Sequence, residues 1–291
     1  MRPPTTLFLA VLLSSCANRP DLAEQLGQHA ARGTIIVAHR GDSGEAPENT
    51  IPAFKSALGR GATLVELDFY TTKDEVLVCF HDRTLDRTTD VVSLWKKKKA
   101  RIIDYTLAEL ESLDAGAWKD ARFKGTRIPT LESALRTIQE GSATMIEHKE
   151  GKPTALVALL RRLDLVSDVL VQSFDWKFLA EVHRLEPRLA LAALGGSESK
   201  PHPEGKVLQE IQRTGAGMVH WSFRGIRLED VASLHAAGLL VCVYTINTDA
   251  DYDRAIDMGV DAITTDFPGR LRARLSARAE RRPSATKGAG L

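Results

Sequence analysis

The sequence is poor in cysteine and aromatic residues and has no excess of either charge. Only 3 of its 291 residues are cysteines, and Cys79 and Cys242 lie in apolar, strand-like runs. We expect both to be small buried residues, with nothing to indicate a disulfide between them. Acidic and basic residues number 38 and 39, so no overall field favours nucleic acid, and we expect no nucleic-acid partner. The sequence carries no pattern that sets an oligomeric state.

The sequence also lacks an apolar run long enough to span a bilayer, but its first residues are typical of an exported protein. The apolar stretch Leu7 to Leu13 ends in Leu13-Ser14-Ser15-Cys16, which resembles the lipobox of bacterial lipoproteins. In such proteins the cysteine becomes the lipidated first residue. We therefore expect a signal peptide at 1–15, acyl chains on Cys16 and a polar tether at 16–33. This predicts a lipid-anchored protein of the bacterial cell envelope; the alternative is an ordinary export signal cut nearby.

After residue 33, strand-like and helix-like segments alternate, which predicts parallel strands joined by helices. The predicted strands are Thr34–Arg40, Leu64–Thr71, Val76–Phe80, Thr144–Lys149, Val169–Phe174, Leu189–Leu194, Met218–Trp221, Leu240–Ile246 and Ala262–Thr265. Only Thr72 to Glu75 separate the second strand from the third, too few residues for a parallel crossover, so we expect a hairpin there. Eight parallel strands remain. They predict an α/β fold, a (β/α)8 TIM barrel over 34–275, followed by a flexible tail at 276–291.

Residues 83–128 do not follow the alternation. They are polar, and we predict that they form a small insertion over the mouth of the barrel, after the second-strand hairpin. The insertion contains Lys96–Lys99 and Arg101. This basic run is typical of a solvated loop, with a contact to anionic lipid as the alternative.

Polar residues follow the apolar part of most predicted strands, and in a barrel these strand ends share one face. Glu66 and Asp68 alternate along one strand, so both side chains point the same way. Two neighbouring carboxylates repel unless a cation separates them, and Glu147 from another strand is a third candidate ligand. We predict one divalent ion, Mg²⁺ or Ca²⁺, since both prefer oxygen ligands. The alternative is a salt-bridge network with Arg40 or Lys149.

Two histidines accompany these acids at strand ends. His39 and His81 are predicted to share acid and base duties around a phosphorus centre. Arg40 would bind the phosphate in a bidentate manner, and Lys149 would add a point charge. The remaining histidines, at 29, 148, 183, 202, 220 and 235, have no such context, and strand alternation points the one at 148 away from the acids.

Eight motifs in sequence order, over about residues 34 to 270, resemble those of the glycerophosphodiester phosphodiesterase family. They are His39-Arg40-Gly41, Pro47-Glu48-Asn49-Thr50, Glu66-Leu67-Asp68, His81-Asp82, Glu147-His148-Lys149, Gln172-Ser173-Phe174, Tyr244-Thr245-Ile246-Asn247 and Thr264-Thr265-Asp266-Phe267-Pro268. The resemblance implies a TIM barrel, metal ligation by Glu66, Asp68 and Glu147, catalysis by His39 and His81, and substrate or phosphate contacts from Arg40, Lys149, Gln172 and Tyr244. Three positions depart from the family's pattern: Glu75 replaces a glycine, His148 an apolar residue and Tyr244 a tryptophan.

These features predict a metal-dependent enzyme that hydrolyses glycerophosphodiesters to sn-glycerol 3-phosphate and an alcohol. Two alternatives stay open. One is a phospholipase D acting on lysophospholipids or sphingolipids, because related barrels use two histidines and a metal. The other is a surface lipoprotein that only binds a ligand, with the barrel as a scaffold.

Overall fold

The computed structural model describes residues 21–196 and 202–281. The expected signal peptide and the lipidated Cys16 lie outside the described residues. The strands are β1 (Ile35–Ala38), β2 (Leu64–Thr71), β3 (Leu77–Cys79), β4 (Ala143–Glu150), β5 (Val169–Ser173), β6 (Ala190–Gly195), β7 (Met218–Ser222), β8 (Leu240–Tyr244) and β9 (Ala262–Thr265). The helices are α1 (Leu22–Ala30), α2 (Ile51–Gly59), α3 (Val91–Leu94), α4 (Leu107–Leu110), α5 (Leu131–Ile138), α6 (Pro153–Arg162), α7 (Trp176–Leu185), α8 (Lys206–Arg213), α9 (Leu228–Ala236), α10 (Asp249–Asp257) and α11 (Pro268–Arg281), with 3-10 turns η1 (Ile102–Asp104) and η2 (Ala121–Phe123).

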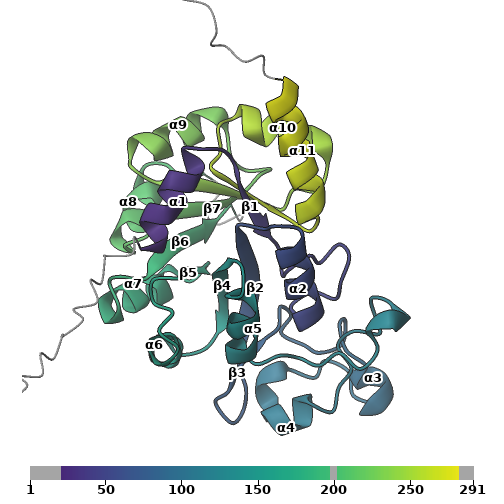
Figure 1. The fold of residues 1–291 in the computed structure, drawn as a ribbon. Coiled ribbons are helices and arrows are strands. Elements are labelled where there is room, and N and C mark those ends of the chain that lie inside the picture. The colour runs from purple at the N-terminus through teal and green to yellow at the C-terminus, as the bar shows by residue number, and fades with distance from the viewer. Residues whose placement is uncertain (1–20, 197–201, 282–291) are drawn as a thin grey trace, which may run out of the picture.

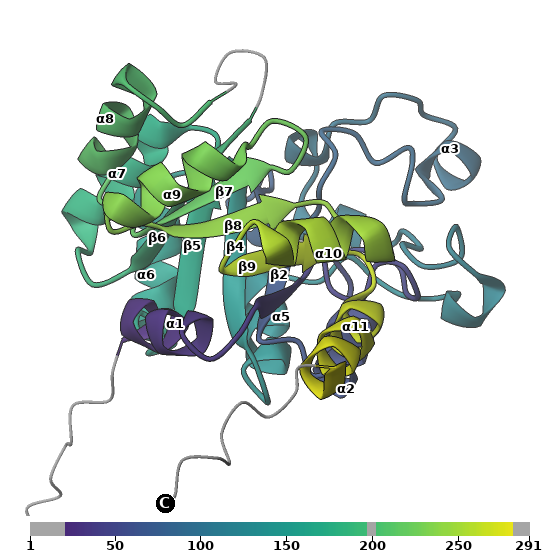
Figure 2. The same cartoon turned by 90° about the horizontal axis from the view of Figure 1, so that it is seen from above.

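Eight parallel strands close into a barrel surrounded by helices, as the alternation predicts (Figures 1 and 2). The sheet runs in the order β1-β9-β8-β7-β6-β5-β4-β2, and the ring closes because β1 pairs with both β9 and β2. Apolar residues that point outward from the strands pack against the helices and form the largest core cluster. The TIM barrel is confirmed.

The predicted hairpin is also confirmed, because β3 lies antiparallel to β2 and outside the parallel ring. Phe69 pairs with Cys79, and the Phe80 amide donates to the Asp68 carbonyl at 3.1 Å. The turn contains Glu75 at φ +63°, the left-handed conformation in which a glycine is easier to accommodate. The exposed Glu75 carboxylate pairs with Lys152 at 2.7 Å. The hairpin thus carries His81 back to the acids of β2.

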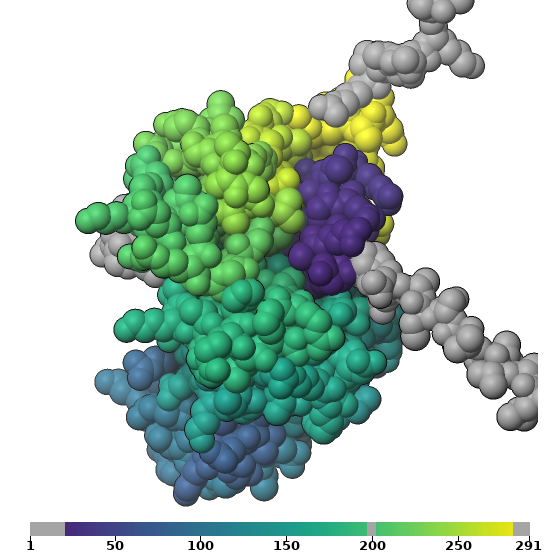
Figure 3. Space-filling model, turned by 90° about the vertical axis from the view of Figure 1, so that its left-hand side faces the viewer, coloured from purple at the N-terminus to yellow at the C-terminus, as the bar shows by residue number. Residues whose placement is uncertain are grey.

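Two terminal segments differ from their predictions. Within the expected tether, residues 22–30 form α1, which begins at the N-cap Asp21. Leu22 and Leu26 are one turn apart and are buried at the amino ends of the strands, so this segment closes the bottom of the barrel. Figure 3 shows α1, in purple, lying on the surface against its green and teal neighbours. At the other end, α11 continues to Arg281, past the predicted limit of 275.

The insertion at 83–128 packs around its own apolar cluster, which includes Leu85, Ile102 and Leu110. It lies at the mouth end of the barrel, away from α7 and α8 (Figures 1 and 2). The Lys119 ammonium donates to the Ser43 carbonyl at 2.8 Å, in the loop after β1. None of its residues is among those that line the central cavity. The insertion therefore borders the mouth, and its expected position over the mouth stays a prediction.

Both described cysteines, Cys79 and Cys242, are buried and unpaired, in agreement with the expectation. Within the described residues, no helix combines the length and the apolar character that crossing a bilayer requires.

Candidate active site

A cavity of about 200 Å³ opens at the carboxyl ends of the barrel strands. Most of the predicted site residues line this one cavity. Its lining consists of His39, Arg40, Glu66, His81, Glu147, Lys149, Gln172, Phe174, Leu194, His220, Tyr244 and Thr245. Residues from both halves of the chain therefore meet at the same place, as the positions of the strand ends predict.

Three buried carboxylates lie together here: Glu66 and Glu147 line the cavity, and Asp68 lies directly beside them. Asp68 and Glu147 are direct neighbours in the β2–β4 pairing, and Glu66 precedes Asp68 by two residues on the same face. One oxygen from each carboxylate lies within 4.8 Å of the others. The three predicted ligands are thus brought together by strand register alone, because each sits on a rigid, hydrogen-bonded strand.

The electrostatics of the three acids fit a cation site. Burial, with the charges of Asp68 and Glu147, raises the pKa of Glu66 well above its usual value. Burial and Asp68 likewise raise the pKa of Glu147 to about 7. Burial also opposes ionisation of Asp68, but Lys149 and Arg40 outweigh it and lower the pKa of Asp68 to about 2. Two of the three acids therefore resist ionisation, and a divalent cation is what would hold all three ionised.

Two cations of the chain surround these acids. The Lys149 ammonium contacts Glu147 and lies 3.1 Å from Asp68, so part of the alternative salt-bridge network is also present. The backbone amide of Arg40 donates to Glu66 at 2.7 Å, and its guanidinium donates to Glu48 at 2.8 Å. Within the described residues the buried Arg40 Nε makes no hydrogen bond, and its nearest acid is Asp68, an ion-pair contact at 3.5 Å. Because this N–H donor is still without a hydrogen bond, it can donate to an anionic ligand beside Asp68.

Each predicted catalytic histidine is paired with an aspartate through Nδ1. The His39–Asp266 distance is 2.6 Å and the His81–Asp82 distance is 2.7 Å. Because a carboxylate only accepts hydrogen bonds, each Nδ1 carries the proton and Nε2 is left to act on a ligand. Burial lowers the pKa of His81, which favours its neutral form.

Each of these aspartates is held in turn by other side chains. Ser43 donates to Asp266 at 3.0 Å and Asn247 donates to it at 2.6 Å. Arg87 donates to both Asp82 and Glu48, and so links the two histidine-bearing segments at the mouth. The sequence prediction included Asp82 and Asp266 in motifs but assigned neither a role.

The dismissal of His220 was wrong. His220 is buried and lines the cavity, where its Nδ1 donates to Gln172 at 2.6 Å and its Nε2 accepts from Thr264 at 2.8 Å. Gln172 in turn lies 3.4 Å from Glu66. Burial lowers the pKa of His220 to about 3, so this histidine is neutral. The signal was present in the sequence: two-residue alternation from Met218 places His220 on the inner face of β7.

One wall of the cavity is apolar. Tyr244 packs edge-on against His220, with ring centroids 4.8 Å apart, and its hydroxyl donates to the Gly195 carbonyl at 2.7 Å. Phe174 stands at the rim with 43% of its surface exposed. His148, as predicted, points outward and stacks on Phe178 at 3.6 Å.

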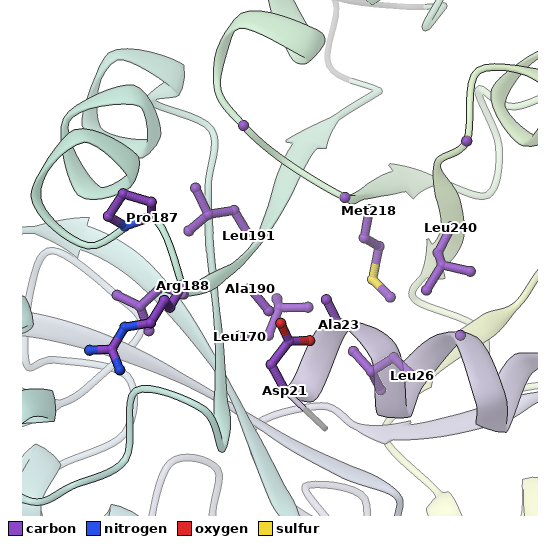
Figure 4. A pocket seen from close by; sticks show the side chains of 15 residues that line it. Asp21, Ala23, Leu26, Leu170, Pro187, Arg188, Ala190, Leu191, Met218 and Leu240 are labelled. Atoms are coloured by element: carbon purple, nitrogen blue, oxygen red, sulfur yellow. The ribbon is translucent and has the colours of Figure 1, made fainter. Parts of the chain in front are cut away.

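A second cavity, of about 400 Å³, lies at the opposite end of the barrel between α1 and the starts of the strands (Figure 4). Leu26, Leu170 and Met218 point into it, and its only charged lining residues are Asp21 and Arg188. Its lining contains no histidine and no cluster of carboxylates. This cavity therefore lacks the histidines and the carboxylate cluster that the cavity at the mouth contains.

Comparisons with known proteins agree with this geometry. Residues 39–270 match the glycerophosphoryl diester phosphodiesterase family. A glycerophosphodiester phosphodiesterase of Bacillus subtilis is 33% identical over 255 residues, covering 80% of this chain and 84% of the relative. One from Caldanaerobacter subterraneus is 34% identical, covering 82% and 96%.

Solved structures give the same result. An Oleispira antarctica phosphodiesterase in complex with the product sn-glycerol-3-phosphate superimposes with a TM-score of 0.76 at 28% identity, covering 85% of this chain and 99% of the other. A glycerophosphodiester phosphodiesterase from Agrobacterium tumefaciens gives 0.70 at 30% identity, covering 82% and 99%. The chain therefore belongs to the glycerophosphoryl diester phosphodiesterase family and is a phosphodiester hydrolase.

Proposed function

We propose that this enzyme hydrolyses glycerophosphodiesters to sn-glycerol 3-phosphate and an alcohol, with one divalent metal and a pair of histidines. The observation that carries the proposal is the convergence of three carboxylates, two Asp-bound histidines and two cations on one cavity. The Oleispira relative binds sn-glycerol-3-phosphate as its product, which supports the same product here.

Glu66, Asp68 and Glu147 would hold Mg²⁺ or Ca²⁺, since carboxylate oxygens are the ligands that both ions prefer. The bound ion would offset negative charge on the phosphate oxygens. Arg40 supplies a buried N–H donor to the same anion, and Lys149 supplies a second positive charge from β4. These residues orient the phosphate between the two histidines.

The histidines then divide the proton transfers. One Nε2 takes a proton from the nucleophile, which is water or the neighbouring hydroxyl of the glycerol group. The new P–O bond forms as the bond to the alcohol breaks, and the other histidine gives a proton to the departing oxygen. Attack by water gives sn-glycerol 3-phosphate directly, whereas attack by the hydroxyl gives a cyclic phosphate that water then opens to the same product, with the histidines exchanging roles. Asp266 and Asp82 keep each ring in the required tautomer and stabilise its protonated form.

The dimensions of the cavity favour a small diester over a lipid with an acyl chain. A volume of about 200 Å³ suits a glycerol phosphate group, and the polar lining gives an acyl chain little apolar surface. The apolar wall of Phe174, Leu194 and Tyr244 would face the alcohol group. We therefore expect the enzyme to cleave water-soluble glycerophosphodiesters faster than lysophospholipids.

The test is release of glycerol 3-phosphate from several water-soluble glycerophosphodiesters and, separately, release of lysophosphatidic acid from a lysophospholipid. Activity should disappear with EDTA and return with Mg²⁺ or Ca²⁺. Glu147→Gln should abolish this return, whereas Glu150→Gln, an exposed acid on the same strand, should not. Cleavage of the lysophospholipid alone would replace the proposed substrate, and full activity in EDTA would refute the metal.

We also propose that Cys16 carries acyl chains that anchor the enzyme to a membrane of the bacterial cell envelope. The support is the apolar run at Leu7 to Leu13 directly before Ser14-Ser15-Cys16. Labelled palmitate fed to expressing cells should enter the protein and should not enter the Cys16→Ala variant. Equal labelling of both proteins would contradict the anchor.

A further inference from the structure

The insertion presents a surface that combines exposed apolar residues with a dense positive charge. We call residues 91–101 the basic patch. It contains five basic residues, Lys96–Lys99 and Arg101, and no acidic one. Val92 and Leu94 on α3 are 36% and 52% exposed, and all four lysines are exposed. Apolar side chains turned to the outside beside such a charge run are not explained by packing of the domain.

The basic patch is a built feature and not a loose loop. Val91 at its start and Ala100, next to its last residue, are buried in the insertion's own apolar cluster. The Asp86 carboxylate accepts from the backbone amides of Lys99 at 2.7 Å and Ala100 at 3.3 Å. The Leu85 amide donates to the Ala100 carbonyl at 2.9 Å. These bonds fix the backbone so that the lysines point outward.

Aromatic residues flank the lysines. Trp95 and Tyr105 are half-buried, with ring centroids 4.8 Å apart. The Lys97 ammonium lies 5.2 Å from the centre of the Tyr105 ring. Tryptophan and tyrosine with one apolar and one polar end are typical of the boundary between water and a bilayer.

Nearby acids do not cancel the charge of the basic patch. Asp86 and Asp90 keep their negative charge, but both are tied to the backbone of the insertion: Asp86 accepts from the two amides named above, and Asp90 accepts from the Asp114 amide at 2.8 Å. Glu109 accepts from the backbone and hydroxyl of Thr106. The whole insertion, residues 83–128, contains 11 basic and 7 acidic residues, so a surplus of positive charge remains when every acid is counted.

We propose that the basic patch docks the enzyme on an anionic phospholipid surface. Val92 and Leu94 would enter the headgroup boundary while the lysines contact lipid phosphates, the combination that holds peripheral proteins on membranes. A nucleic-acid backbone would match the charge but would leave the two apolar side chains without a partner. Thr84 and Arg101 form a β-bridge just after the His81-Asp82 motif, so docking would hold the mouth of the barrel close to the membrane.

The test measures binding of the full chain to sedimented vesicles of phosphatidylcholine alone and of phosphatidylcholine mixed with phosphatidylglycerol. Cys16→Ser in every protein removes acylation, and the neutral vesicles account for any contribution of the apolar N-terminus. Lys97→Glu/Lys98→Glu should weaken binding to the anionic vesicles by at least about tenfold, given the attraction of each lysine near such a surface. Leu94→Ser should weaken it by a smaller factor that persists at high salt.

The matched control is Lys55→Glu/Lys206→Glu, which makes the same charge change at exposed positions on α2 and α8. It should bind within about twofold of the parent, since charges far from the membrane are screened. An equal loss in the control pair, or unchanged binding in the basic-patch pair, would overturn the proposal. All variants should cleave a water-soluble glycerophosphodiester at the parental rate, so a failure of docking is separate from a failure of the proposed hydrolysis.

Discussion

The two ends of the barrel interior differ sharply, although the same strands build both. Along β2 the inward side chains change from Leu64 to Glu66 and Asp68, and along β7 they change from Met218 to His220. The amino half is thus an apolar plug sealed by α1, whereas the carboxyl half is a charged cavity open to solvent. The transition takes two residues, one step of the strand repeat.

This contrast separates stability from chemistry along each strand. The apolar half supplies rigid strands with fixed register, so the polar half can hold like charges close together without the fold collapsing around them. Burial of three neighbouring acids costs free energy even with Lys149 and Arg40 beside them, and the apolar end and the outer shell offset this cost. Substitutions at the two ends should therefore have opposite effects on activity and stability.

The largest expected effect comes from the mouth. His39→Ala or His81→Ala should lower turnover by about 10²–10⁴-fold, because each removes a proton-transfer group. The free energy of unfolding should change by less than about 1 kcal/mol, since both rings are partly exposed. Turnover assays and urea unfolding check this. His235→Ala, which breaks a His–Asp pair of 2.8 Å on the helical shell, is the control and should retain activity.

A substitution at the amino end of the barrel should lower stability and leave turnover unchanged. Leu64→Ala removes a fully buried side chain from the apolar plug and should cost about 2–5 kcal/mol of unfolding free energy. Below its unfolding transition the variant should keep the parental turnover and metal affinity. If Leu64→Ala lowered turnover without lowering the free energy of unfolding, the idea that the apolar end contributes only to stability would be wrong.

Metal affinity at the mouth should fall in acid. Burial and Asp68 raise the pKa of Glu147 to about 7, and an acid must lose its proton to bind a cation. Each displaced proton weakens the apparent affinity by about tenfold per pH unit below that pKa. Calorimetric titration with Mg²⁺ or Ca²⁺ at several pH values, in buffers of different ionisation enthalpy, would count the protons released. An affinity independent of pH below about 7 would contradict this.

The smallest expected effect concerns the rim of the mouth. Arg87 is 46% exposed and links Asp82 to Glu48, so it orients His81 only indirectly. Arg87→Ala should lower kcat by no more than about fivefold, because exposed ion pairs contribute at most about 1 kcal/mol. Arg184→Ala, which breaks an exposed pair with Glu181 on α7, should leave kcat unchanged. Equal kcat values for the two variants would show that the link does not position His81.

The barrel and most of the site were predictable from sequence because both depend on strand periodicity. The crossover argument at Thr72 to Glu75 identified the hairpin, and alternation identified the shared face of Glu66 and Asp68. Glu147 also lies in the predicted place, since parallel strands bring their carboxyl ends to one face. In these cases the two-residue alternation of a strand, or the minimum length of a crossover, was enough to predict which distant residues meet.

The features that were not predicted depend on contacts between distant segments, which strand and helix periodicity do not specify. His220 was set aside because no acid or arginine lies directly beside it in the sequence, yet in the barrel it faces Gln172 from another strand. The helical nature of α1 was hidden in a short polar segment whose Leu22 and Leu26 have a partner only once the strands are assembled. The pairing of His39 with Asp266 joins residues 227 positions apart.

The hairpin of β2 and β3 has a consequence for how this enzyme could be altered. The Cys79 amide donates to the Pro129 carbonyl at 2.9 Å, and Val78 bridges to Thr130, so the insertion leaves and rejoins the barrel at nearly the same point. A segment with adjacent ends can be exchanged for a shorter or longer one at little cost in loop-closure entropy. The insertion of one family member could thus replace that of another and change which surface the enzyme binds, while the residues of the active site keep their positions.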